Sequence, residues 1–279
     1  MRSGRQQLDG EHGDVELAFV EWGPPNGRPT LCVHGLTRNA RDFDPLAAAL
    51  GEAGARVLAV DVVGRGQSSW LADPNDYAVP VYAAQFARFL KLRGLPEVDW
   101  IGTSMGGLIG MTVAASDESP IRRLVLNDIG PMVPQPALAM IALYLGRELR
   151  FSSLAELEGH LRTIHAGFGP LTDPQWRHLA TYSARQDADG WRLAYDPMIK
   201  VPFTTAAATD IDLWELWPRI ACPTLVLRGE LSPILTVETA TRMAETGPRA
   251  RVRTLPGIGH APALMADDQI DIVRDWLSE

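Results

Sequence analysis

Residues 100–111 read W-I-G-T-S-M-G-G-L-I-G-M and place one serine, Ser104, between glycines two residues away on either side. The apolar residues before the serine predict a strand, and those after it predict a helix. Glycine is a poor choice inside either element, but it suits a sharp turn where a side chain would collide with the backbone. We interpret Gly102 and Gly106 as positions where the absence of a side chain permits such a turn. The pattern Gly-x-Ser-x-Gly is typical of a nucleophile elbow, which raises a serine on a strained strand-to-helix turn.

Short apolar runs alternate with helical patterns through most of the chain. An alternating run at 15–22 predicts an antiparallel or edge strand, and continuous apolar runs predict buried strands. The predicted strands lie at 15–22, 30–34, 56–61, 98–103, 123–128, 224–229 and 251–255, and the predicted helices at 43–50, 79–93, 105–115 and 270–277. This alternation indicates an α/β fold with a mostly parallel sheet and right-handed crossovers.

The composition argues against several classes of protein. A formal net charge of −8, without a strong run of Lys and Arg, argues against nucleic acid as the main partner. No run of about 18 apolar residues exists to span a membrane. The polar start of the chain lacks the apolar segment of a signal peptide, so we expect a cytoplasmic protein. The two cysteines, Cys32 and Cys222, and the six scattered histidines show no metal-binding spacing, so we expect no metal and no cofactor.

The segment 131–212 breaks the strand–helix rhythm. It carries helical patterns from Ala137 and Phe151, turn signals such as G-F-G-P from Gly167, and no clear strand. We interpret it as a helical cap inserted into a core domain formed by 1–130 and 213–279. We expect this cap to roof an apolar pocket and to set specificity.

Ser104 requires a base, because a serine hydroxyl is a weak nucleophile by itself. The candidate base is His260, which lies after the last predicted strand in a glycine-containing loop, L-P-G-I-G-H from Leu255. A histidine near neutral pH can accept the serine proton and later return it.

A tetrahedral intermediate also needs hydrogen-bond donors for its oxyanion. The backbone N–H of Met105 is one candidate, because the first N–H groups of a helix have no intrahelical partner. The backbone N–H of Leu36 is the second, in the loop V-H-G-L-T after an earlier strand. In that loop we expect His34 and Gly35 to lie at the rim of the substrate pocket.

With these features the chain resembles the α/β-hydrolase superfamily, in particular its serine hydrolases with a helical cap. The motifs are H-G-L at His34, D-V-V-G-R-G-Q-S at Asp61, G-T-S-M-G-G at Gly102, N-D-I-G-P at Asn127, R-G-E at Arg228 and G-H at Gly259. The resemblance covers nearly the whole chain. It implies an α/β-hydrolase fold with a mostly parallel eight-stranded sheet flanked by helices, and a bracing role for Asp61 beside the site.

The acid that orients the histidine is where the chain departs from the family. The family usually places it after the strand equivalent to 224–229, but the turn G-E-L-S-P puts Pro233 there. A proline side chain cannot accept a hydrogen bond from an imidazole. Asp128, at the end of the strand before the cap, is the first substitute, because some family members use that position. Glu230 is the alternative, and a site without any acid is the third possibility.

These residues predict a serine hydrolase that cleaves a carboxylic ester, or a related lactone or thioester, through an acyl-enzyme on Ser104. The predicted partner is a small ester-like molecule with an apolar acyl or alcohol part. A carbon–carbon bond hydrolase of the β-diketone type stays open, and so does cofactor-free oxygen chemistry in the apolar pocket. A ligand-binding receptor or signalling protein is the alternative from another class, because a fold does not determine a function. The oligomeric state does not follow from the sequence.

Overall fold

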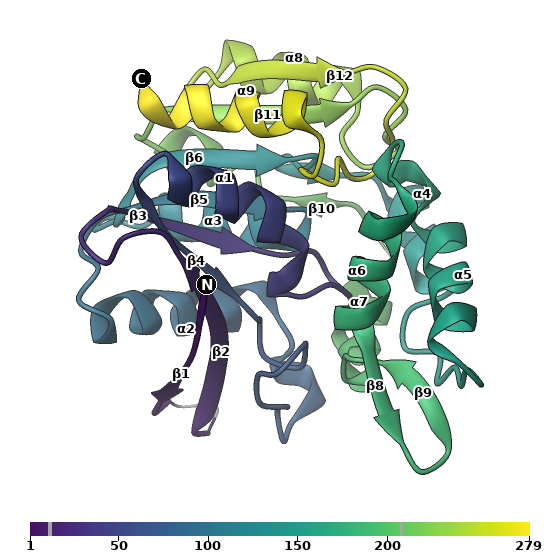
Figure 1. Ribbon diagram of the computed structural model, residues 1–279. Helices are drawn as coiled ribbons and strands as arrows, with labels where there is room; N and C mark the ends of the chain where they lie inside the picture. Colours follow the sequence, from purple (N-terminus) through teal and green to yellow (C-terminus); the bar gives the residue numbers. More distant parts are fainter. Residues whose placement is uncertain (11–12, 207–208) are drawn as a thin grey trace.

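The computed structural model describes residues 1–10, 13–206 and 209–279. Its centre is an eight-stranded sheet of β1 (Arg2–Leu8), β2 (Val15–Trp22), β3 (Arg28–Val33), β4 (Ala55–Val60), β5 (Val98–Thr103), β6 (Ile121–Asn127), β11 (Thr224–Gly229) and β12 (Arg251–Leu255). Their order across the sheet is β1-β2-β4-β3-β5-β6-β11-β12 (Figure 1). β2 pairs antiparallel with β1 and β4, and the other neighbours pair parallel, which confirms the predicted fold class.

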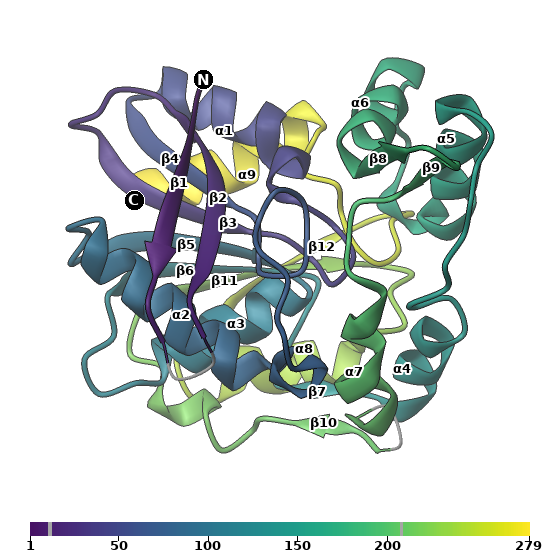
Figure 2. The same ribbon diagram turned by 90° about the horizontal axis from the view of Figure 1, so that it is seen from below.

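Helices cover both faces of this sheet. Figure 2 shows α1 (Asp44–Glu52) and α9 (Asp267–Ser278) on one face, and α2 (Val79–Leu92), α3 (Met105–Ala114) and α8 (Val237–Glu245) on the other. In β3, Leu31 and Val33 join the apolar core on the α2 side, whereas Cys32 joins the core on the α1 side. A strand buried on both faces needs apolar residues at every position, which explains its continuous apolar run.

The segment 131–212 lies beyond the carboxyl ends of the parallel strands (Figure 1). It contains β7 (Met132–Val133), α4 (Gln135–Ala142), α5 (Leu154–Ile164), α6 (Asp173–Ser183), β8 (Ala184–Asp187), β9 (Gly190–Leu193), α7 (Lys200–Ala206) and β10 (Ile211–Asp212). The expectation of no strand in this segment was wrong, because β8 pairs with β9 and β10 pairs with β7. These strands are at most four residues long, so none of them contains an apolar run long enough to mark it.

In the core, strand β1 and helix α8 also lacked a prediction. The edge strand β1 reads R-S-G-R-Q-Q-L and is largely exposed, so hydrogen bonding to β2 rather than burial defines it. Helix α8 buries only a narrow stripe that includes Ala240 and Met243. Within the described ranges, no helix combines the length and the apolar character needed to cross a membrane.

Candidate active site

Ser104 occupies the turn between β5 and α3 with a strained backbone. Its φ of 51° and ψ of −116° lie outside the regions that L-residues favour. A Cβ on Gly102 would lie 2.3 Å from the Gly106 carbonyl oxygen, and one on Gly106 would lie 2.0 Å from the Val33 oxygen. The Ser104 N–H donates to the Asn127 carbonyl at 3.0 Å and ties the turn to β6. The two glycines therefore permit the turn, and the turn presents the serine.

His260 joins Ser104 to Asp128. Its Nδ1 lies 2.8 Å from Asp128 Oδ2, and its Nε2 lies 2.9 Å from Ser104 Oγ. A carboxylate oxygen only accepts hydrogen bonds, so Nδ1–H donates to Asp128 and Nε2 accepts from the serine hydroxyl. The His260 side chain is 20% exposed, whereas the Asp128 side chain is fully buried. This geometry matches a nucleophile, a base and an orienting acid in series.

The Asp128 carboxylate is held from two sides. Asp128 follows β6 directly and has a left-handed φ of 55°. Its backbone N–H donates to the Leu227 carbonyl of β11 at 2.8 Å. Its Oδ1 accepts the Gly229 N–H at 2.8 Å, while Oδ2 accepts from His260. The adjacent strand thus fixes the carboxylate so that its second oxygen faces the imidazole.

The two residues of the usual acid loop lie elsewhere. Glu230 is exposed, and its Oε2 accepts the Gly257 N–H at 2.8 Å. Pro233 is also exposed. In the part of the chain that the structure describes, Glu230 makes no hydrogen bond to His260. The structure therefore brings together Ser104, His260 and Asp128, and leaves Glu230 outside.

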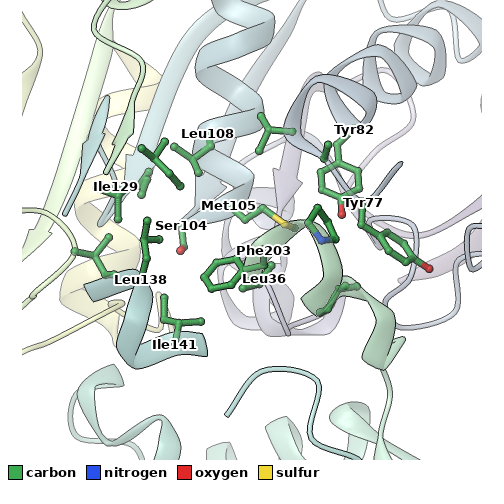
Figure 3. Close-up of a pocket in the computed structure, with 17 residues that line it drawn as sticks. Leu36, Tyr77, Tyr82, Ser104, Met105, Leu108, Ile129, Leu138, Ile141 and Phe203 are labelled. Atoms are coloured by element: carbon green, nitrogen blue, oxygen red, sulfur yellow. The ribbon is translucent and has the colours of Figure 1, made fainter. Parts of the chain in front are cut away.

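The two expected oxyanion donors lie beside the serine. Leu36 and Met105 line the same cavity as Ser104 (Figure 3). A Cβ on Gly35 would lie 3.6 Å from Ser104 Cβ, so the Leu36 loop runs within van der Waals contact of the nucleophile. Across residues 1–10, 13–206 and 209–279, neither backbone N–H donates to another protein group. Both can therefore donate to a substrate oxygen.

His34 and Gly35 lie outside that cavity. Both line a second cavity of about 30 Å³, together with Thr103 and Ala261. The buried His34 ring donates from Nδ1 to the Gly35 carbonyl at 2.8 Å and accepts the Val62 N–H on Nε2 at 2.9 Å. Burial lowers the pKa of His34 to about 3, so the ring stays neutral. His34 therefore connects the backbone at Gly35 with the backbone at Val62, and it lines a cavity other than the one at Ser104.

Arg65 supports both oxyanion candidates, and sequence reasoning missed it. Its side chain is fully buried. Its Nε donates to the Leu36 carbonyl at 2.8 Å, and its Nη2 lies 3.6 Å from Met105 Sδ. Nη1 donates to the Val63 carbonyl and the Tyr82 hydroxyl, each at 2.8 Å. Arg65 sits inside the D-V-V-G-R-G-Q-S motif, but arginine is usually a surface residue, so composition alone does not reveal this role.

Asn127 is a second supporting residue without a prediction of its own. Its Nδ2 donates to Thr103 Oγ1 at 3.0 Å and to the Pro262 carbonyl at 2.8 Å. It thereby connects the ends of β5 and β6 with the loop that carries His260. Asp61 accepts two backbone N–H groups, as the family resemblance implies for a bracing residue, and burial raises its pKa to about 6.

A cavity of about 210 Å³ opens at Ser104. Side chains from the ends of the strands, the loop before α2, α4 and α7 surround it (Figure 3). Apart from Ser104 and two tyrosines, its lining is apolar: Leu36, Ala78, Val79, Met105, Leu108, Ile129, Val133, Leu138, Ile141, Ile199, Pro202, Phe203, Ile211 and Ile234. Such a lining suits an uncharged, apolar part of a ligand.

Comparison with known proteins identifies the family to which the chain belongs. The 3-hydroxybutyrate-oligomer hydrolase of Cupriavidus necator is 42% identical over 288 aligned residues, which cover 99% of this chain and 98% of that protein. A protein from Rickettsia typhi superposes with a TM-score of 0.94 at 32% identity and covers 100% of this chain and 99% of its own. An α/β hydrolase from Novosphingobium aromaticivorans superposes with a TM-score of 0.87 at 35% identity, over 99% and 98%. A family model described as the alpha/beta hydrolase fold matches residues 29–265, and the chain therefore belongs to the α/β-hydrolase family.

Proposed function

We propose that this enzyme hydrolyses carboxylic esters through an acyl-enzyme on Ser104, with His260 as base and Asp128 as orienting acid. The observation that carries the proposal is the continuous hydrogen-bond chain from Ser104 Oγ through His260 to Asp128, with heavy-atom distances of 2.9 and 2.8 Å. Carboxylic ester hydrolysis is the activity class of the enzyme, in keeping with the relative that is 42% identical over 99% of the chain.

The first half-reaction transfers the acyl group. Ser104 Oγ attacks the carbonyl carbon of the ester while its proton moves to His260 Nε2. The negative charge that develops on the carbonyl oxygen is held by the Leu36 and Met105 N–H groups. The Asp128 carboxylate stabilises the imidazolium that forms. When the intermediate collapses, the carbon–oxygen bond to the alcohol breaks, and the alcohol leaves with the proton from His260.

The second half-reaction reverses these roles with water. His260 Nε2 takes a proton from the water, and the water oxygen bonds to the acyl carbon of the Ser104 ester. The same backbone donors hold the second oxyanion. Collapse breaks the bond to Ser104 Oγ, which recovers its proton from His260, and the free acid departs. The enzyme returns to its starting state without any other reactant.

Esters of short hydroxy acids are the substrates that we propose. The curated relative carries the name 3-hydroxybutyrate-oligomer hydrolase. The 210 Å³ apolar cavity at Ser104 has room for the acyl part of such an ester. Leu138, Ile141 and Phe203, from the segment 131–212, contribute to its lining. We therefore propose that this segment acts as a cap that selects the acyl group, on a core of 1–130 and 213–279.

The proposal is tested with a nitrophenyl butyrate and with the linear dimer of 3-hydroxybutyrate. We expect multiple turnovers by the wild type, a covalent adduct of one fluorophosphonate per chain located on Ser104 by mass spectrometry, and loss of both in Ser104→Ala. Saturable binding of esters without turnover would favour a receptor instead. Cleavage of a β-diketone in preference to both esters would favour the carbon–carbon bond hydrolase.

A further inference from the structure

Arg38 presents a buried guanidinium with one edge unused. It follows Leu36 by two residues, and its side chain is 6% exposed. Nε and Nη2 each donate to a different oxygen of Asp42 at 2.7 Å. Nη1 donates to no acceptor in the described ranges. A guanidinium has two edges that can bind a carboxylate, and Asp42 occupies only the edge that contains Nε.

Arg38 lines a cavity whose other residues carry several hydrogen-bond donors. This small cavity, about 10 Å³ in volume, lies between the Leu36 loop and the segment 131–212, and it contains no acidic side chain. Its lining is Thr37, Arg38, Tyr144, Leu149, His160, Leu161, Ile164, His165, Leu193 and Tyr195. The buried His165 Nε2 has no hydrogen-bond partner among the residues that the structure describes. A buried polar atom without a partner is costly, and a polar group of a bound molecule would satisfy it.

The lowered pKa of His165 and the raised pKa of Tyr144 keep both side chains neutral at neutral pH beside the Arg38 cation. Burial holds the pKa of His165 well below its usual range, with the Arg38 charge adding to the effect. Burial raises the pKa of Tyr144 to about 12, so its hydroxyl keeps its proton at neutral pH. One cation and several neutral groups with N–H or O–H donors therefore meet at a place where no protein carboxylate lines the wall.

This cavity adjoins the reaction centre. Arg38 also lines the 30 Å³ cavity that contains Gly35. A Cβ on Gly35 would lie 3.6 Å from Ser104 Cβ and 3.8 Å from Arg38 Cγ, so only Gly35 separates the two side chains. On the other side, the Gly259 N–H donates to the Gly167 carbonyl at 2.8 Å. That bond connects the His260 loop to the turn that follows His165.

We propose that Arg38, His165 and Tyr144 bind the carboxylate of a substrate whose alcohol part is a hydroxy acid. The inference rests on the proposed ester hydrolysis and specifies its leaving group. In an ester of a 3-hydroxy acid, two carbon atoms separate the ester oxygen from the carboxylate carbon, which matches a subsite that adjoins the nucleophile. The acyl part then occupies the apolar cavity of about 210 Å³ on the Leu36 and Met105 side.

The subsite must widen to accept this group, because a volume of about 10 Å³ corresponds to a single water molecule. Tyr144 and His165 belong to the segment 131–212, whereas Arg38 belongs to the core, so a small movement between them enlarges the cavity. Asp42 already balances the charge of Arg38 before the substrate arrives. The neutral donors of His165 and Tyr144 are therefore needed to make a second carboxylate favourable.

The test compares two substrates that differ only in this charge: the linear 3-hydroxybutyrate dimer and its methyl ester. KM and kcat are measured for the wild type, Arg38→Gln and Tyr144→Phe. We expect Arg38→Gln to raise KM for the free acid by about 10- to 100-fold, the usual effect of losing a hydrogen bond to a charged group. For the methyl ester, KM should change by less than about threefold. Tyr144→Phe should also raise the ratio of KM for the free acid to KM for the methyl ester, but by a smaller factor.

Arg41→Gln is the matched control. Arg41 pairs with Asp44 through the same two nitrogens as Arg38 uses for Asp42. Its guanidinium, however, lies 3.7 Å from the centre of the Tyr182 ring and lines neither cavity. Arg41→Gln removes one positive charge close to the position of Arg38. A general electrostatic effect on an anionic substrate would therefore raise KM in this variant as well. We expect it to leave the ratio of the two KM values unchanged.

Three results would overturn the proposal. The wild type could show equal KM values for acid and methyl ester, or Arg38→Gln could raise both KM values equally. The control Arg41→Gln could also change the ratio of the two KM values as much as Arg38→Gln does. If Arg38→Gln fails to fold, as judged by circular dichroism, the Tyr144→Phe ratio decides alone. Absence of any ester turnover by the wild type is a different outcome, because it contradicts the ester hydrolysis itself. Turnover of both substrates without discrimination leaves ester hydrolysis intact and removes only the carboxylate subsite.

Discussion

Strands β6 and β11 lie side by side and run parallel, yet their carboxyl ends are used differently. β6 is followed by Asp128, which is fully buried and bonded to His260. β11 ends at Gly229, which contributes a backbone N–H to Asp128, and the next residue, Glu230, faces solvent. Either loop reaches the edge of the sheet where the histidine lies. The difference indicates that burial and a fixed direction, rather than the mere presence of a carboxylate, decide which residue can bond to His260.

The largest test of this comparison is Asp128→Asn. An amide at this position can donate to Nδ1 and so favours the wrong tautomer of His260. We expect kcat for a nitrophenyl ester to fall on the order of 10⁴-fold, as when a triad acid is replaced by its amide. Circular dichroism should show an intact fold. A loss below about tenfold would mean that His260 needs no acid or takes one from elsewhere.

A second variant tests whether the loop after β11 can supply the acid for His260. Asp128→Asn combined with Pro233→Asp restores a carboxylate at the position that the family usually employs. We expect kcat to recover about tenfold over Asp128→Asn alone, which corresponds to about 1.4 kcal/mol of transition-state stabilisation. Asp128→Asn with Pro233→Ala is the control for loss of the proline. Equal rates in the two double variants would show that the loop no longer approaches the histidine.

Asn127→Ala tests the other polar residue at the end of β6. Its amide holds both Thr103 and the Pro262 carbonyl, so its loss loosens the loop that carries His260. We expect the free energy of unfolding in urea to fall by about 1–3 kcal/mol, because the buried Pro262 carbonyl loses a hydrogen bond. The fall in kcat should be much smaller than for Asp128→Asn. Unchanged stability would contradict a bracing role.

The smallest effect is expected for Glu230→Gln in the β11 loop. Glu230 is exposed, and its hydrogen bond from the Gly257 N–H can be kept by the amide oxygen of glutamine. Stability should change by less than about 0.5 kcal/mol, as is usual for a surface substitution. kcat should stay close to that of the wild type. A large fall in kcat here would reverse the assignment of the acid.

Local sequence patterns predicted some of the elements around the active site and missed others. Strand and helix positions near Ser104 follow from short apolar runs, because a two-sided sheet demands them. The short strands β8 and β9 escaped prediction because backbone hydrogen bonds between partly exposed residues define their pairing, and neither strand contains an apolar run. Arg65 also escaped, because the motif that contains it does not reveal that its side chain turns inward to the Leu36 carbonyl.

The sequence by itself determined the α/β-hydrolase fold and pointed to Ser104, His260, Leu36 and Met105, because the backbone of a sharp turn or a helix start restricts residues locally. It favoured Asp128 over Glu230 as the acid and left open a site without any acid. Only the tertiary structure decided which carboxylate meets the histidine, since that depends on the left-handed backbone of Asp128 and on the Gly229 N–H of the next strand. The same holds for Arg38 and His165, which are far apart in the chain and line one cavity only after the segment 131–212 has packed on the core.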